Sequence, residues 1–378
     1  MQFGTMNTPS HPPHRDLAEG HYHNLDYLIF LDRLGVDEAW IGSHYTVVSE
    51  PQAPNDLLIA QAIPQTKRIR LNPGAFIVPF FHPAELAHRI AWLDQIAKGR
   101  MIVGIGASGV PTDLDMFGID FRSNQSREMV EESLNMMRWL WSSTEPDEYK
   151  GKYWTVRHPR PMVDGKLRFH MRPFQKPHPR FAITGASPNS PTLKLAGRYN
   201  LIPSSFCFGV DYIRSHWDSV IEGAESAGRD PPPKQDWRIV RDVFIGDTDK
   251  EAMDFAVNGP MGQHFRNFYL PMLKEAGLLR SLKHRADDAD SDVTIEYLAK
   301  YSWTVGSEAT VFEKLSELYD RADGFGVLVA NSYDHLDCME RWRSSITKLA
   351  TDIVPKLDSL KKQKGIESAS PAIANACI

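Results

Sequence analysis

The stretch that decides the fold is Pro83–Gly109, PAELAHRIAWLDQIAKGRMIVGIGASG, which predicts a helix, a glycine stop, a strand and a glycine-rich turn. Apolar residues recur at helical spacing through its first half, and the MIVGI run that follows is almost wholly apolar. Such a run is typical of a strand buried on both faces, as in a parallel sheet. Because the strand ends in glycines, its carboxyl end can approach a ligand closely.

The rest of the chain repeats this unit of strand and helix. Strict alternation implies parallel strands joined by right-handed crossovers, and eight such units favour a closed (β/α)8 TIM barrel of the α/β class. An open doubly wound sheet is the alternative. The strands are expected at 1–6, 39–41, 69–76, 101–105, 181–184, 201–206, 239–245 and 327–330.

Helices are expected between the strands, and one segment interrupts the repeat. Residues 145–180 are rich in Pro, Lys and Arg and are interpreted as an insertion with a hairpin near Tyr153–Trp154. A helical extension is expected over 334–360, followed by a frayed tail at 361–378. We find no linker and expect residues 1–378 to form a single domain. The other helices are expected near 16–35, 54–62, 83–97, 124–141, 210–227, 248–278 and 308–322, with one more that begins at 190–191.

Composition narrows the possible partners and compartment. The 378 residues include 43 Lys and Arg against 48 Asp and Glu, without a long basic run, which argues against nucleic acid or a membrane surface as a partner. Cys207, Cys338 and Cys377 are too far apart for a disulfide framework or a zinc pattern. With no signal-peptide core and no run of ~18 apolar residues, a cytoplasmic protein is expected.

Candidate site residues follow from the predicted barrel, whose active site should lie at the carboxyl ends of the strands. This position selects His44, the 72–75 segment, Gly106–Ala107 and the Thr184–Ser190 turn. Ser190 suits an N-cap, and Pro191 suits the first helical position, so this helix start is a candidate phosphate site. An ordinary capped helix explains Ser190 and Pro191 equally well. A structural role is likewise an alternative for His44, a single histidine after a strand.

Two other sites are considered and set aside. Gly104–Gly109 reads GIGASG, a match to the dinucleotide-binding GxGxxG pattern. Pro111 follows too soon for a helix to run through the third glycine, so we favour a glycine turn beneath a flat cofactor. The histidines at 11, 14, 21 and 23 do not show metal-ligand spacing, and no metal is expected.

Aromatic residues near the strand ends are the candidates for an apolar substrate pocket. They could equally belong to the hydrophobic core, and the sequence leaves both interpretations open. These residues are Tyr45, Phe76, Phe80, Phe206, Phe208 and Trp303.

With these residues in hand, the chain resembles the luciferase-like flavin-dependent monooxygenases, and most of all the branch that contains diketocamphane and limonene monooxygenases. The resemblance runs in order from residue 1 to about 335. It rests on MQFGTM (1–6), WIGSH (40–44), HPAELA (82–87), GRM (99–101), VGIG (103–106), DMFG (115–118), PHPR (177–180), LAGRY (195–199), GDTDKEA (246–252) and VGS (305–307).

The resemblance implies a homodimeric TIM barrel that receives reduced FMN (FMNH2) from a separate NAD(P)H-dependent flavin reductase. With O2, such an enzyme inserts one oxygen atom into a small apolar substrate, cyclic or terpenoid, and a Baeyer–Villiger oxidation is preferred. The alternatives are an epoxidising or hydroxylating relative, a non-catalytic flavin-binding protein, and a deazaflavin enzyme that transfers hydride. A pyridine-nucleotide dehydrogenase is the most distant.

The resemblance also implies roles for individual residues. His44 matches a histidine at the reacting edge of the flavin, where a neutral imidazole is expected. Gly74–Ala75 matches a position where the family often has a non-prolyl cis peptide beneath the ring. The remaining cofactor-binding residues implied are Asn72, Gly106, Ala107, Thr184, Gly185, Ala186, Ser187 and Ser190, the last five in the turn that holds the phosphate.

The chain departs from the family pattern at two positions. Ser43 stands where the family often has Glu, so His44 is expected to lack that carboxylate. Ala107 stands where many members have a phosphate-binding Arg. FMN is therefore expected to rely on hydroxyl and backbone N–H groups and to exchange readily.

Overall fold

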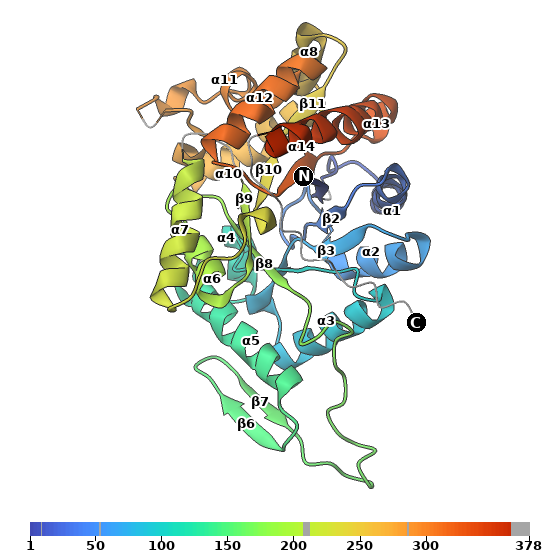
Figure 1. The fold of residues 1–378 in the computed structure, drawn as a ribbon, viewed down its shortest axis with the longest axis vertical. Coiled ribbons are helices and arrows are strands. Elements are labelled where there is room, and N and C mark those ends of the chain that lie inside the picture. Colours follow the sequence, from blue (N-terminus) through green and yellow to red (C-terminus); the bar gives the residue numbers. More distant parts are fainter. Residues whose placement is uncertain (9, 53, 207–211, 286, 364–378) are drawn as a thin grey trace.

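The computed structural model describes residues 1–8, 10–52, 54–206, 212–285 and 287–363 (Figure 1). Cys207, Phe208 and Cys377 lie outside the described residues, as does most of the tail predicted at 361–378. The last described helix, α14 (Val354–Gln363), continues past the predicted end of the helical extension at residue 360.

Nine parallel strands form the central sheet, which curves into a nearly closed barrel (Figure 1). Their spatial order is β3-β2-β1-β13-β10-β9-β8-β5-β4. Because β3 and β4 are consecutive pieces of one bent segment, they close the barrel and together fill one of eight positions, as expected for a TIM barrel. The strands are β1 (Gln2–Asn7), β2 (Glu38–Ile41), β3 (Arg70–Pro73), β4 (Phe76–Ile77), β5 (Val103–Gly106), β8 (Phe181–Gly185), β9 (Ile202–Phe206), β10 (Arg238–Arg241) and β13 (Val327–Ser332).

Two predicted strands are each divided into two shorter strands. One further strand, β12, was not predicted from the sequence. The 69–76 segment divides at the cis peptide Gly74–Ala75. The 239–245 segment divides at Asp242, after which β11 (Val243–Ile245) leaves the barrel and pairs with the unpredicted β12 (Thr304–Gly306). The buried carboxylate of Asp242 accepts hydrogen bonds from Asn331 and Tyr333, which hold the chain where it leaves the barrel.

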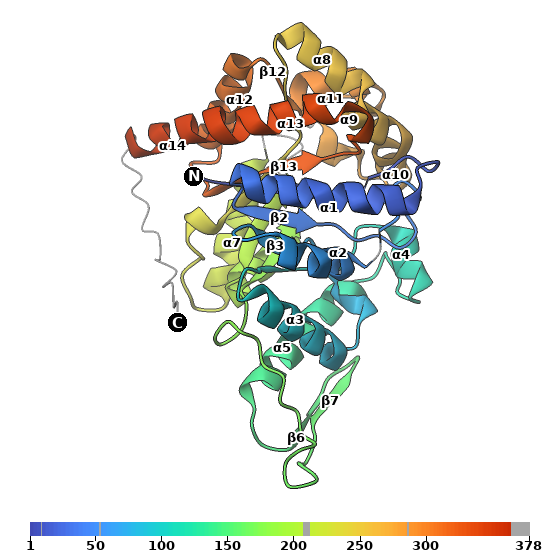
Figure 2. The same cartoon turned by 90° about the vertical axis from the view of Figure 1, so that its right-hand side faces the viewer.

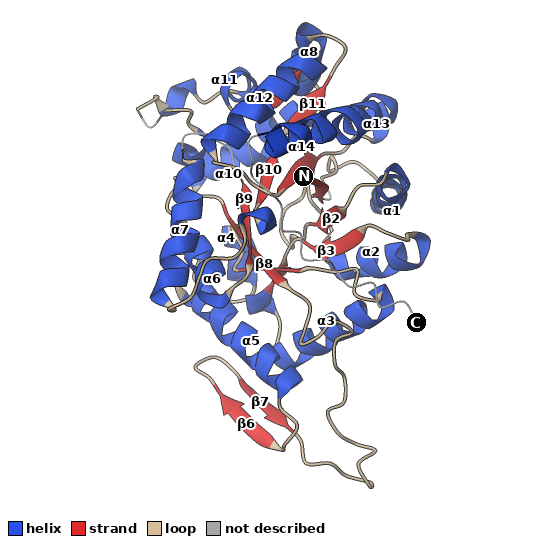
Figure 3. Cartoon of the chain, in the orientation of Figure 1, coloured by secondary structure: helices blue, strands red, loops and turns tan. Residues whose placement is uncertain are grey.

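The helices surround the barrel (Figures 1 and 3). In the described part of the chain, none combines the length and apolar character needed to cross a bilayer. They are α1 (Leu17–Leu34), α2 (Asn55–Ala62), α3 (Pro83–Ala97), α4 (Pro111–Met116), α5 (Gln125–Ser142), α6 (Pro191–Tyr199), α7 (Ile213–Ser226), α8 (Asp249–Asn258), α9 (Pro260–His264), α10 (Leu270–Glu275), α11 (Ile295–Tyr301), α12 (Glu308–Arg321), α13 (Met339–Lys348) and α14. Two π-helical segments, η4 (Phe265–Tyr269) and η8 (Leu349–Ile353), continue α9 and α13.

The unit around α3 forms as predicted, with a small change at its end. Pro83 occupies the first helical position, and both Lys98 and Gly99 take left-handed φ values of 53° and 80°. The helix stop therefore involves two residues, where the sequence indicated Gly99 alone. The apolar stripe is buried against the barrel and consists of Leu86, Ile90, Leu93 and Ala97.

One of the two helix predictions that involve a proline needs correction. The helix expected over 248–278 is interrupted at Gly259, because Pro260 starts a new helix there. The prediction that Pro111 keeps a helix from running through the third glycine is confirmed, because Pro111 is the first residue of α4. Gly109 stays outside α4, so the dinucleotide-binding geometry is still not formed.

The insertion contains the predicted hairpin and projects from the barrel (Figures 1 and 2). Its antiparallel strands are β6 (Asp147–Lys150) and β7 (Thr155–His158). Glu132 of α5 accepts hydrogen bonds from the backbone N–H groups of Lys152, Tyr153 and Trp154. The loop of the hairpin is thus fastened to α5.

Candidate active site

The strand ends singled out in the sequence meet at one end of the barrel. The parallel register sets Ile41 of β2 beside Pro73 of β3, and Ile77 of β4 beside Gly106 of β5. Strand β5 also pairs with β8. The segments that follow these strands therefore leave at the carboxyl-terminal mouth, where TIM barrels place their active sites.

Small residues form a floor at this mouth. Gly74–Ala75 is a cis peptide, as the family resemblance implied, and the Cβ of Ala75 lies 3.5 Å from the Cβ position of Gly106. The amide of Asn55 donates hydrogen bonds to the carbonyls of Ile41 and Ala75, which fixes the bend. Ala75, Gly106 and Ala107 are half-buried, so the floor is accessible and has no side chain larger than methyl at these positions.

His44, which follows β2, is held by a carboxylate at each ring nitrogen. Nε2 lies 3.1 Å from Oε2 of Glu50, and Nδ1 lies 3.2 Å from Oδ2 of Asp113. The His44 side chain is 24% exposed, whereas both carboxylates are buried. Because an ionised carboxylate only accepts hydrogen bonds, this arrangement favours hydrogen on both ring nitrogens and so favours the imidazolium form.

This arrangement bears on two expectations about His44. Burial disfavours its charge, but the carboxylates of Glu50 and Asp113 outweigh that cost and raise the pKa of His44. The two carboxylates therefore favour the charged form of His44 over the neutral imidazole that the resemblance implied. Ser43 supplies no carboxylate, as its sequence position indicated, but residues 50 and 113 provide two.

Asp113 also organises the loop that carries His44. Its side chain is fully buried in α4 and accepts hydrogen bonds from the backbone N–H groups of Tyr45 and Thr46, at 3.1 and 2.7 Å, and from the Thr46 hydroxyl at 2.6 Å. Burial alone would raise the pKa of Asp113, but the bonds from His44 and Thr46 lower it. Asp113 thus stays ionised and fixes residues 44–46.

Glu50 links His44 to a second histidine. Its Oε1 lies 3.3 Å from Nε2 of His264 in α9, and Nδ1 of His264 lies 2.9 Å from the Ser10 hydroxyl. Burial lowers the pKa of His264, although Glu50 and Asp242 act in the opposite direction. A neutral His264 donates from Nε2 and accepts from Ser10. We call Ser10, His264, Glu50, His44 and Asp113 the histidine–carboxylate chain.

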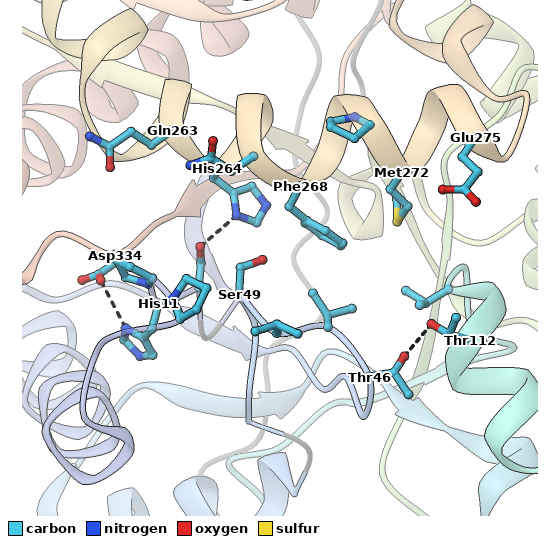
Figure 4. A pocket seen from close by; sticks show the side chains of 18 of the residues that line it. His11, Thr46, Ser49, Thr112, Gln263, His264, Phe268, Met272, Glu275 and Asp334 are labelled. Atoms are coloured by element: carbon cyan, nitrogen blue, oxygen red, sulfur yellow. Dashed lines mark hydrogen bonds and ion pairs between the residues drawn. The ribbon is translucent and has the colours of Figure 1, made fainter.

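A cavity of ≈ 1120 Å³ adjoins this chain (Figure 4). The segment from α9 to α10 covers one side, and the loop after β2 and the start of α4 form the other, where the Thr46 and Thr112 hydroxyls lie 2.6 Å apart. Ser10 and His264 belong to its wall, whereas the residues predicted from sequence lie outside its lining. The histidine–carboxylate chain therefore connects the cavity with His44.

The Thr184–Ser190 turn leads from β8 into α6. Ala186, Ser187 and Asn189 are exposed there, so the backbone at the start of the helix is accessible. Ser190 occupies the N-cap position and Pro191 the first helical position as predicted, but the Ser190 side chain makes no capping hydrogen bond. The helix start thus has no side-chain cap from Ser190.

His216 of α7 is hydrogen-bonded to this turn. The Nε2–H of His216 in α7 donates to the Ser187 carbonyl at 2.9 Å, and the Asn189 N–H donates to the Ser215 hydroxyl at 3.1 Å. Burial lowers the pKa of His216 to about 4, so the ring is neutral near pH 7. It holds the turn in place without adding charge.

The predicted pocket aromatics divide into two groups. Tyr45 contacts Phe80 and Phe117 edge-on, and these two rings stack with centroids 4.0 Å apart. Phe206 is half-buried at the end of β9. These residues are placed to contribute apolar surface near the mouth.

The other group is buried in the protein interior. Phe76 and Trp303 are each 2% exposed and belong to the main hydrophobic core, which favours the core interpretation for both. Asn72 is also fully buried, and its amide oxygen accepts a hydrogen bond from the Ile102 N–H at 2.7 Å. Asn72 therefore ties β3 to the residue before β5.

Sequence reasoning missed Glu50, Asp113 and His264. A proline followed by an acidic residue marks a helix start, and that signal at Pro111 and Asp113 would have placed a carboxylate near the mouth. No spacing pattern links residues 50 and 264, because their contact depends on how the segment after α8 folds back over the barrel.

Comparison with known proteins gives matches over nearly the whole chain. The profile of a family described as luciferase-like monooxygenase matches residues 1–323. The 3,6-diketocamphane 1,6-monooxygenase of Pseudomonas putida is 32% identical over 374 residues, which cover 94% of this chain and 98% of that protein. The 2,5-diketocamphane 1,2-monooxygenase 1 of the same species is 32% identical over 363 residues, with 94% and 99% covered.

A solved structure has the same architecture. It is the oxygenating constituent of 3,6-diketocamphane monooxygenase from P. putida, a type II Baeyer–Villiger monooxygenase in complex with FMN. Its TM-score with this chain is 0.86 at 33% identity, and the match covers 94% of this chain and 98% of that one.

Proposed function

The chain belongs to the luciferase-like monooxygenase family, and from that premise we propose that it is the oxygenase of a two-component system that uses reduced FMN and O2. One oxygen atom enters a small apolar ketone, cyclic or terpenoid, as in a Baeyer–Villiger oxidation. The other oxygen atom leaves as water while FMNH2 is oxidised to FMN. The relatives that act on diketocamphanes support a ketone as substrate.

The observation that carries this proposal is the convergence of three features on one mouth of the barrel. The Ala75–Gly106 floor has room for a flat ring because no long side chain rises from it. The uncapped start of α6 suits a phosphate, and His44 lies at the same mouth with its ring held by Glu50 and Asp113. Together they fit a planar cofactor that carries a phosphate.

The protein residues bind and orient in this proposal. When bound, reduced FMN supplies the electrons that activate O2. The Ser187–Ser190 turn holds the phosphate through hydroxyl and N–H groups, while Tyr45 and Phe206 offer apolar surface to the substrate. His44 presents a preorganised imidazole ring, held by Glu50 and Asp113, to the reacting groups.

Weak phosphate anchoring supports a flavin that is delivered rather than permanently bound. Ala107 offers no cation, and the two basic side chains of α6 are paired elsewhere: Lys194 with Glu222 at 2.6 Å and Arg198 with Glu131 at 3.5 Å. A separate NAD(P)H-dependent flavin reductase would then supply FMNH2.

The test is a reconstituted reaction with the purified full-length chain, an FMN reductase, NADH and FMN under ¹⁸O₂. With 3,6- or 2,5-diketocamphane as the probe, we expect a lactone that carries one ¹⁸O atom. Limonene serves as the alkene control. Oxygenation of limonene without lactone formation would reject the Baeyer–Villiger assignment, and quantitative release of H2O2 with both probes would reject the oxygenase itself.

We also propose that a second copy of the chain covers the outer face of α2 and α3. The Arg89–Asp56 ion pair joins these helices, and beside it Leu57, Trp92 and Ile96 are exposed. Trp92 and Ile96 are four residues apart and so lie on one face of α3. A tryptophan 57% exposed on such a face is typical of an interface anchor.

Replacing Trp92 with glutamate is therefore expected to weaken dimerisation by about tenfold or more, because the anchor is lost and a charge is buried. Light scattering after size exclusion over a dilution series measures the shift. Met162→Glu, an exposed apolar residue on the projecting insertion, is the matched control and should leave the dimer intact. A monomeric wild-type chain at all concentrations would contradict this proposal.

A further inference from the structure

We propose that Glu50 is a positioning residue for His44, held in place by His264 and Ser10, and that it keeps His44 as a cation that donates from both ring nitrogens. The inference rests on the proposed function for its role in catalysis. The contacts of Glu50 with His44 and His264 do not depend on that function.

Glu50 has the geometry of a bridge between two imidazoles. Oε2 faces Nε2 of His44 at 3.1 Å, and Oε1 faces Nε2 of His264 at 3.3 Å. The Glu50 side chain is 4% exposed and that of His264 is 7% exposed, so solvent does not compete strongly for either bond. The two oxygen atoms thus have distinct partners.

The second histidine fixes the direction of every hydrogen bond in the bridge. Because ionised Glu50 only accepts, the hydrogen of a neutral His264 lies on Nε2, and Nδ1 then accepts from the Ser10 hydroxyl at 2.9 Å. Glu50 then accepts on both sides and needs no proton of its own. His44 must supply the hydrogen on its Nε2.

Charge balance favours the same state. Asp113 and Glu50 are two buried carboxylates on either side of His44, and a neutral ring would leave both without a cation from that residue. Among the described residues, the other titratable groups that face the bridge are His264 itself, Tyr269 and Tyr333, whose rings contact His264, and Asp242 just after β10. The groups around the bridge thus come from the loop after β2, α4, α9, η4 and the segments that follow β10 and β13.

The consequence for catalysis is a charge that does not depend on the substrate. A ring fixed by two carboxylates is already oriented before the reaction, so its orientation costs no reorganisation during the reaction. His264 and Ser10, which hold the bridge, also line the cavity.

The test measures the protonation of His44 in the full-length chain without flavin. The imidazole signals of ¹⁵N-histidine-labelled protein are followed by NMR from pH 5 to 10, and the His44 signal is the one missing in His44→Gln. In wild type we expect a midpoint above the ordinary value of ~6.5. In Glu50→Gln, which keeps the shape and removes the charge, we expect the midpoint to fall by about 1 to 2 pH units.

Controls separate this role from a structural one. Glu50→Asp keeps the carboxylate and should retain a midpoint above that of Glu50→Gln, and Glu85→Gln on the surface of α3 should not move it. The alkaline limb of the oxygenation rate should shift in parallel with the NMR midpoint. An unchanged His44 midpoint in a folded Glu50→Gln variant overturns the proposal, whether or not the chain oxygenates the diketocamphane probes.

Discussion

Replacement of His44 by alanine is expected to lower the rate of lactone formation by about a hundredfold or more, while O2 consumption continues and H2O2 appears in its place. The physical reason is the loss of the one cation that the structure fixes between Glu50 and Asp113 at the barrel mouth. Removal of a preorganised electrostatic or proton-transferring group typically costs 10²- to 10⁴-fold. Reduced FMN that reacts with O2 without oxygen transfer yields H2O2, so the two products are measured together.

The same replacement should leave the protein folded but less stable. Without the imidazolium, Glu50 keeps His264 and Asp113 keeps the N–H groups of Tyr45 and Thr46, so neither carboxylate loses all its partners. We expect a loss of about 2 kcal/mol in the free energy of unfolding, which is smaller than the total for a typical domain. Chemical denaturation followed by circular dichroism measures it.

A double variant separates stability from activity. In His44→Ala/Glu50→Gln one unbalanced carboxylate is removed, so part of the lost stability should return while lactone formation stays low. His44→Gln provides a ring-free side chain that still forms hydrogen bonds. Full lactone-forming activity in His44→Ala or in His44→Gln would show that His44 has only a structural role.

The fold was predictable because its signal is repeated along the chain. Each strand–helix unit carries an apolar run and a glycine or proline boundary, as at Met101–Ile105 and Pro83, and eight weak signals reinforce one another. The errors fall where tertiary contacts override local preference. Asp242 interrupts an apolar run because its carboxylate pairs with residues of β13 and the segment after it, which no local pattern reveals.

The candidate site was predictable only in part, and for a related reason. Residues at strand ends, such as His44 and Gly106, are found once the barrel is recognised, because topology brings every strand end to one mouth. Glu50 lies in a loop, and His264 lies in α9, a helix that follows another helix. The barrel topology does not determine where the side chains of such segments lie. The pKa of His44 depends on Glu50, so the sequence could place His44 at the mouth but could not identify this carboxylate partner.

The second large effect concerns the packing that supports the phosphate turn. α6 and α7 cross at two glycines: a Cβ on Gly197 would lie 1.9 Å from the Val220 carbonyl oxygen, and one on Gly223 would lie 2.0 Å from the Lys194 carbonyl oxygen. Both contacts are with backbone, so no change of side-chain rotamer relieves them. The helices must separate to admit a methyl group.

Gly197→Ala is therefore expected to lower the free energy of unfolding by about 3 kcal/mol, at the upper end of the range for overpacking. Because α6 begins at the Thr184–Ser190 turn and His216 of α7 holds that turn through the Ser187 carbonyl, the separation should also displace the turn. We expect FMN affinity, measured by fluorescence titration, to fall by about tenfold or more.

Gly109→Ala is the matched control for stability, since a Cβ there meets nothing within 4 Å. If Gly197→Ala lost stability but bound FMN as wild type does, the phosphate would have to lie away from the α6 turn, whereas a fully stable variant would show that the two helices can part without cost.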